Sequence, residues 1–130
     1  MFAPGGQGKS APIDPHDISS VAAKALATPG HEGKRYVLTG EEILSAAEQV
    51  DILGAALGRP LRFVDVPEAG ARAGMLKAGM DEVMVDALME LMSRVRTGSE
   101  ALRTTTVRDM TDVARRTFAE WVKNHLAAFE

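Results

Sequence analysis

The 130-residue chain contains no cysteine, and its aromatic residues are few, with one Trp and one Tyr. Without thiols there is neither a disulfide framework nor a thiolate metal site, which favours a reducing, cytoplasmic setting. The three histidines, His16, His31 and His125, are too scattered for the paired spacing of a helical metal site. No apolar run approaches the ~18 residues that cross a membrane. The sequence therefore predicts no metal site and no membrane partner.

Positive charge is also scarce, because 15 Lys and Arg stand against 18 Asp and Glu and leave a formal net charge of -3. Proteins that bind nucleic acids rely on clustered Lys and Arg to neutralise phosphates. We therefore expect no nucleic-acid partner. A chain that is 45% hydrophobic and 25% charged has the composition of an ordinary globular domain.

Helices are predicted wherever apolar residues recur at helical spacing behind a capping residue. Asp14 caps the first of these, with Pro15 in its opening turn. Asp81 caps another, and Thr117 with Glu120 has the spacing of a capping box. The expected helices cover residues 14–28, 41–57, 67–79, 81–96 and 117–129, with a short helical turn at 109–116.

Strands are expected to be short. Lys34–Leu38 is β-branched and aromatic, and Leu61–Val66 alternates like a half-buried strand. Residues 1–13 are rich in Gly and Pro and are predicted to form a loop, followed by a single domain over residues 14–130. The predicted class is a helix-rich α/β or α+β fold with about five helices and two or three short strands.

Ala3–Ser10, with the sequence APGGQGKS, matches a loose form of the phosphate-binding loop. Such a loop works because a strand delivers its glycines and a helix follows at once, aiming backbone N–H groups at the phosphates. Only two residues precede this match, and Pro12 and Pro15 lie where the helix should run. We therefore reject nucleotide binding here and expect a mobile loop in which Lys9 contributes nothing to function or stability.

Dehydrogenase motifs are also missing. No G-x-x-G-x-x-G or G-x-G-x-x-G joins a strand to a helix, so a Rossmann pyrophosphate site is not expected. The sole tyrosine, Tyr36, has Gly40 four residues later where short-chain dehydrogenases have Lys. The sequence thus predicts no catalytic residue and no cofactor-binding residue.

Four residues are candidates for binding a substrate. His16, in the first helical turn after Asp14, has the side chain that titrates near neutrality and suits a proton donor at a cleft. Met75, Met80 and Met84 suit the lining of an adaptable pocket for a small apolar ligand. The alternatives are a solvent-facing histidine beside a cap and methionines that pack in the core or at a subunit interface.

The helix expected from Asp81 to Arg96 has an unusually wide apolar arc, which extends along Met84, Leu88, Leu91 and Val95. A lone monomer would leave part of this arc exposed to water. We therefore expect a homodimer, or a partner chain with a Rossmann domain, that covers it. The alternative is that the other helices of the same chain cover the arc.

Segments spread over nearly the whole chain resemble a known family when they are read in order. They are Ile13–Ile18 (IDPHDI), His31–Gly40 (HEGKRYVLTG), Leu57–Pro67 (LGRPLRFVDVP) and Phe118–Val122 (FAEWV). Together they resemble the carboxyl-terminal, substrate-side half of NmrA-like atypical short-chain dehydrogenases. The resemblance implies that the segment at Tyr36 forms a strand of a Rossmann sheet, and that relatives bind NAD(H) or NADP(H) as reductases, isomerases or redox-sensing regulators.

The family's amino-terminal βαβ units, with their glycine fingerprint, have no counterpart in this sequence. We therefore expect a partial Rossmann-type remnant that holds no cofactor by itself. The leading hypothesis is an accessory, non-catalytic substrate-side domain that binds a small molecule or a partner. One alternative is a subunit or portion of an NAD(P)-dependent reductase or isomerase, completed by a separate dinucleotide-binding chain. Another is a regulatory protein-interaction module.

Overall fold

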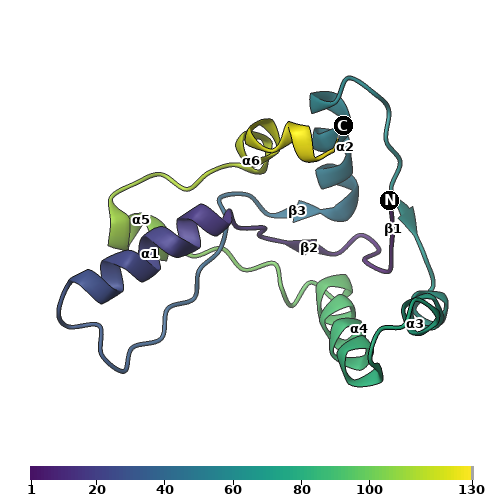
Figure 1. Ribbon diagram of the computed structural model, residues 1–130, viewed down its shortest axis with the longest axis horizontal. Coiled ribbons are helices and arrows are strands. Elements are labelled where there is room, and N and C mark those ends of the chain that lie inside the picture. Colours follow the sequence, from purple (N-terminus) through teal and green to yellow (C-terminus); the bar gives the residue numbers. More distant parts are fainter. Residues whose placement is uncertain (130) are drawn as a thin grey trace. The chain divides into compact units, whose positions relative to one another are not determined.

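The computed structural model describes residues 1–129, in which six α-helices and four two-residue strands follow one another (Figure 1). The helix-rich α/β class predicted from the sequence is confirmed. These residues form two compact units, which we call the first unit (residues 1–10 and 44–101) and the second unit (residues 11–43 and 102–129). The predicted division was different, with a segment of residues 1–13 and one domain after it. No helix of the described residues is long and apolar enough to span a membrane.

The first ten residues contain two short paired strands, where only a loop was predicted. In the first unit, β1 (Phe2–Ala3) runs parallel to β4 (Val64–Asp65), and β2 (Lys9–Ser10) runs antiparallel to β3 (Leu44–Ser45). The backbone N–H of Val64 donates to the Met1 carbonyl at 2.8 Å, which starts the first pair. The Gly- and Pro-rich sequence gave no local indication of β1 and β2, because each pairs with a strand more than thirty residues away.

Helix α2 (Ala46–Ala56) begins later than predicted. Its capping box is formed by Ser45, whose hydroxyl accepts from the Glu48 N–H, and by the Glu48 carboxylate, which accepts from the Ser45 N–H. The expected start at residue 41 is wrong, because Leu44 and Ser45 are extended where they pair with β2. An extended backbone at these two residues prevents a helix from starting before Ala46.

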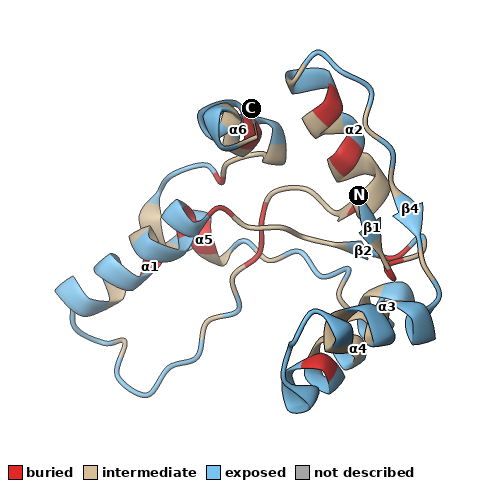
Figure 2. Cartoon of the chain, turned by 45° about the vertical axis from the view of Figure 1, so that its right-hand side comes forward, coloured by how far each residue is buried: buried red, intermediate tan, exposed pale blue. Residues whose placement is uncertain are grey.

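Helices α3 (Glu68–Lys77) and α4 (Glu82–Arg96) begin close to the positions predicted from Pro67 and the Asp81 cap. The two helices lie side by side (Figure 1). The Asp81 carboxylate accepts from the N–H groups of Val83 and Met84. Val85 is the buried residue of α4, and its burial contributes roughly 1.5–3 kcal/mol (Figure 2). Most of the remaining surface of both helices is exposed or half-buried.

In the second unit, α1 (Pro15–Ala27) begins as predicted, with Asp14 accepting from the His16 N–H at 2.8 Å. Helix α5 (Thr106–Thr111) contacts α1, and each contributes one buried valine, Val21 and Val107 (Figure 1). The helical turn expected at 109–116 lies earlier than predicted. It ends at Asp112, whose positive φ of 57° takes the chain out of the helix.

Lys34–Leu38 does not form the predicted strand. The segment is held through Thr104 instead, whose hydroxyl donates to the Val37 carbonyl and whose N–H donates to the Thr39 hydroxyl, both at 2.9 Å. A strand needs a ladder of backbone bonds from a neighbouring strand. No strand among residues 1–129 pairs with this segment.

Helix α6 (Phe118–Asn124) begins at the predicted capping box of Thr117 and Glu120. It stops earlier than predicted, at His125, and a 3-10 turn, η1 (Leu126–Ala128), follows. Phe118, Trp121 and His125 stack along one side of the helix, with Trp121 between the other two. Val122, the residue after Trp121, is fully buried.

Candidate functional site

An apolar groove of about 570 Å³ lies in the first unit, between the ends of β1 and β4 and one side of α3. Its apolar side chains are contributed by residues far apart in sequence, among them Phe2, Val66, Met75 and Met80. Phe2 is 75% exposed and Met80 is 38% exposed, so the groove is open to water. Gly70 and Gly74 face it from α3, and a Cβ on either would meet open space. The groove therefore has room for a ligand above its helical floor.

Two of the four predicted site residues, Met75 and Met80, line this groove. Met84 does not, because it lies on α4 with 55% of its surface exposed. Phe2 and Val66 were not predicted, since the first depends on the unforeseen strand β1 and the second lies at the end of a strand placed only approximately. The signal for Met75 and Met80 was the flexible, polarisable thioether side chain.

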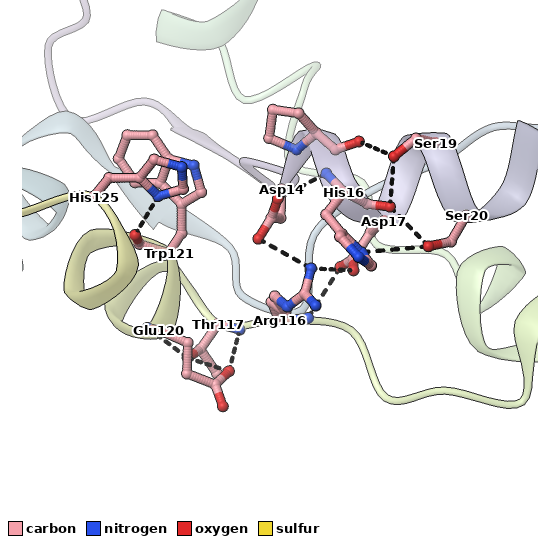
Figure 3. Close-up of polar contacts among 11 residues, drawn as sticks. Asp14, His16, Asp17, Ser19, Ser20, Arg116, Thr117, Glu120, Trp121 and His125 are labelled. Atoms are coloured by element: carbon pink, nitrogen blue, oxygen red, sulfur yellow. Dashed lines mark hydrogen bonds and ion pairs between the residues drawn. The ribbon is translucent and has the colours of Figure 1, made fainter. Parts of the chain in front are cut away.

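His16 lies elsewhere, in the second unit, where it lines a polar hollow of about 320 Å³ with Asp14, Arg116, Asn124 and His125. Its Nδ1 is 3.3 Å from the Ser20 hydroxyl (Figure 3). His16 therefore lines a hollow, but not the one that Met75 and Met80 line. Arg116 and His125 were not predicted as neighbours because they follow it by about a hundred residues.

The charges of this hollow come from one arginine and two buried carboxylates. Nη1 of Arg116 is 3.6 Å from Asp14 Oδ2 and 3.8 Å from Asp17 Oδ1, while the Arg116 backbone N–H donates to Asp17 Oδ2 at 3.0 Å (Figure 3). The carboxylates outnumber the guanidinium, so the cluster carries a net negative charge. In the part of the chain that the structure describes, no group of three or more metal-ligating side chains is assembled.

The glycine-rich loop at residues 5–8 packs against α4. A Cβ on Gly8 would lie 2.1 Å from the Val95 carbonyl oxygen, so the loop is pressed against the end of α4. The N–H of Gly6 donates to Asp65, which also binds Arg96. Strand β2, not a helix, follows the loop in the chain, so the loop lacks the strand-to-helix context of a phosphate-binding loop. Gly8 serves close packing against α4.

Lys9 is not on a mobile loop, which corrects the expectation for this residue. Its ammonium lies 2.7 Å from Glu48 Oε1, with 45% and 44% of the two side chains exposed. The hydrogen bond from Lys9, reinforced by the Ser45 N–H, lowers the pKa of Glu48 to about 2. Lys9 thus joins strand β2 to the first turn of α2.

Comparison with known proteins places these features in a class. No family model matches the chain. It is 42% identical over 129 residues to the NAD(P)H azoreductase of Xenophilus azovorans, an overlap of 99% of this chain and 45% of that protein. It is 37% identical over 117 residues to the (4-alkanoyl-5-oxo-2,5-dihydrofuran-3-yl)methyl phosphate reductase of Streptomyces griseus, covering 90% of this chain and 41% of the relative. The NADPH-dependent quinone oxidoreductase of Escherichia coli superposes with a TM-score of 0.83 at 25% identity, over 97% of this chain and 46% of that structure.

These relatives are NAD(P)-dependent oxidoreductases. The chain is related to the NmrA-like members of that class and corresponds to their carboxyl-terminal half, so the resemblance read from the sequence is confirmed. It spans less than half the length of the relatives it matches.

Replacing Lys9 with Met should raise the pKa of Glu48 from about 2 toward its ordinary value of 4.5, because the largest stabilising contact is lost. The Ser45 N–H, at 2.6 Å, should keep it from rising the whole way. A carboxyl group with a lowered folded pKa stabilises the fold above its unfolded pKa and loses that contribution as the pH falls through its folded pKa. The variant should therefore lose this contribution at a higher pH than the wild type.

Carbon-detected NMR titration of the Glu48 carboxyl measures both values. Lys9→Arg is the control and should leave the pKa low, since an arginine keeps the charge and the hydrogen bond. An unchanged Glu48 pKa in Lys9→Met would contradict the ion pair.

Proposed function

We propose that the chain forms the substrate-side portion of a cytoplasmic NAD(P)H-dependent reductase, and that the apolar groove beside α3 binds the substrate. By itself the chain binds this ligand and carries out no redox chemistry. The groove is the observation that carries the proposal, because it is the largest apolar hollow described here and it contains Met75 and Met80. Likeness to an azoreductase and a quinone oxidoreductase supports the reductase class.

The lining of the groove favours a small, uncharged aromatic or otherwise apolar substrate. At about 570 Å³ the groove lies within the range of small-molecule sites. Methionine side chains are flexible and polarisable, so they adapt to flat ligands of different outline. No charged side chain lines the groove, and a charged ligand would lose its hydration there without gaining a partner.

The dinucleotide is the part of the reaction that these residues do not supply. The glycine loop is packed on α4, and the chain has no Rossmann fingerprint. We infer that NAD(P)H is held by a separate dinucleotide-binding portion, as the names of the relatives imply for the complete enzymes. The residues described here bind and orient the substrate.

Replacing Gly74 with Leu should weaken ligand binding at the groove about tenfold or more, because the new side chain enters the open space above α3. Tenfold corresponds to about 1.4 kcal/mol. The probe is 4-hydroxyazobenzene, a flat and uncharged azo compound, and equilibrium dialysis measures its dissociation constant. Leucine favours a helix more than glycine, so the variant should stay folded.

Ala73→Leu is the matched control, since Ala73 is the exposed neighbour on the same helix and does not line the groove. It should bind the probe like the wild type. Equal weakening by both substitutions, or no saturable binding by the wild type, would contradict the assignment of the groove.

A second candidate function, self-association, is favoured by the exposed side of α4. Val83, Met84 and Leu91 are 77%, 55% and 41% exposed, which is unusual for apolar residues this large on one helix. We infer that a second copy of the chain covers this side, since closed two-fold pairing is the commonest arrangement. Such a dimer is compatible with ligand binding in the groove, to which Met84 does not contribute.

Leu91→Glu should convert the dimer to a folded monomer, because a carboxylate would be buried without a partner in the paired surface. Sedimentation velocity reports the mass, and circular dichroism confirms that the helices remain. Glu90→Gln, on the exposed neighbouring residue, should leave the dimer intact. A wild type that sediments as a monomer at high concentration would rule out the association.

A further inference from the structure

A second pocket lies in the second unit, and the function proposed above does not use it. It has a volume of about 240 Å³. Its apolar walls are Pro12, Ile13, Pro15, Phe118 and Trp121. A cavity of roughly 150 Å³ is known to hold benzene, so this pocket has room for one substituted aromatic ring.

The aromatic wall of the pocket is held in place by its own stacking. The Trp121 indole stacks on Phe118 with centroids 5.7 Å apart and on His125 with centroids 4.7 Å apart. The planes are tilted by only 21° and 24°. His125 Nδ1 is also 2.7 Å from the Trp121 carbonyl oxygen, which fixes its ring (Figure 3). Both faces of the indole are covered by these two neighbours, so the indole presents to the pocket a restrained edge that needs little reordering when a ligand arrives.

The polar side of the pocket is Arg116 with Asp14. Both distances from Arg116 Nη1, 3.6 Å to Asp14 and 3.8 Å to Asp17, suit ion pairs but exceed the length of a hydrogen bond. The guanidinium charge is thus already balanced by two carboxylates, while its N–H groups are not committed to short bonds with either of them. Its side chain is 35% exposed, whereas that of Asp14 is 7% exposed, so a ligand meets the guanidinium first.

This combination selects the charge of the ligand. An anion would lie beside two carboxylates as well as the guanidinium, and a cation would meet the more exposed guanidinium before either carboxylate, so part of the cluster repels each of them. A neutral hydrogen-bond acceptor can bind the N–H groups of Arg116 without repulsion from either charge. A planar ring can contact the indole of Trp121 and the two prolines, Pro12 and Pro15.

We propose that the pocket binds a small, uncharged, planar aromatic compound that carries a carbonyl group. The ring lies against Trp121 and Phe118, and the carbonyl oxygen accepts a hydrogen bond from the Arg116 guanidinium. The site lies wholly within the second unit and shares no residue with the groove of the first unit. The two sites are therefore tested independently.

Three probes of the same shape test the charge requirement on the wild-type chain: benzamide, benzoate and benzylammonium. Trp121 is the sole tryptophan, so its emission on excitation at a wavelength that the probes do not absorb reports this pocket alone. Benzamide should change the emission saturably, with a dissociation constant on the order of a millimolar for so small a ligand. Benzoate and benzylammonium should bind about tenfold more weakly or less. Equal binding of all three, tighter binding of either ion, or no saturation with benzamide would overturn the proposal.

Arg116→Lys tests the role of the guanidinium, because it keeps a positive charge opposite Asp14 and Asp17 but removes the planar donor group. Benzamide binding should fall about tenfold. Arg103→Lys, at an exposed arginine of the same unit that does not line the pocket, should bind benzamide like the wild type. Unchanged binding by a folded Arg116→Lys variant would show that Arg116 is not the donor, and if that variant fails to fold, the comparison of the three probes on the wild type decides.

Discussion

Two adjacent arginines hold the second unit together, and its other features depend on them. Arg115 is buried and donates to the carbonyls of Gly40 and Thr104, while its Nη2 lies 2.6 Å from Glu41. Arg116 faces the two carboxylates at the start of α1. Burying a carbonyl or a carboxylate without a partner costs free energy. Arg115 and Arg116 supply partners to such groups in three separate segments of the chain. These two arginines hold three features in place, namely the start of α1, the segment at Gly40 and the wall of the Trp121 pocket.

The first unit depends on a steric constraint instead. Gly8 approaches the Val95 backbone so closely that no other residue fits, and this contact lets residues 1–10 run as strands beside β3 and β4. The groove beside α3 is a consequence, because its far wall is formed by Phe2 and the residues after it. The same glycines that resemble a phosphate loop in sequence are used for packing.

Features with local causes were predictable from the sequence. The caps at Asp14, Asp81 and Thr117 each need only a side chain and the next few backbone N–H groups, and all three are present. Features that depend on contacts between residues far apart in sequence were not predictable. Strand β1 exists because of Val64, α2 begins late because of Lys9 and Ser10, and Lys34–Leu38 is not a strand because its neighbour is Thr104. The site divides in the same way, since the chemistry of the thioether indicated Met75 and Met80 as pocket residues, whereas the pairing of Arg116 with the first turn of α1 has no local signal.

The central claim is that these residues form a substrate-side surface that holds no dinucleotide by itself. Isothermal titration calorimetry with NADPH tests it most directly, with the NADPH-dependent quinone oxidoreductase of Escherichia coli, whose structure has been solved with NADPH, as the positive control. We predict saturable heat for the control and none for this chain at micromolar to millimolar cofactor, since a strand and not a helix follows its glycine loop. Saturable binding of NADPH to this chain at micromolar concentration would contradict the claim.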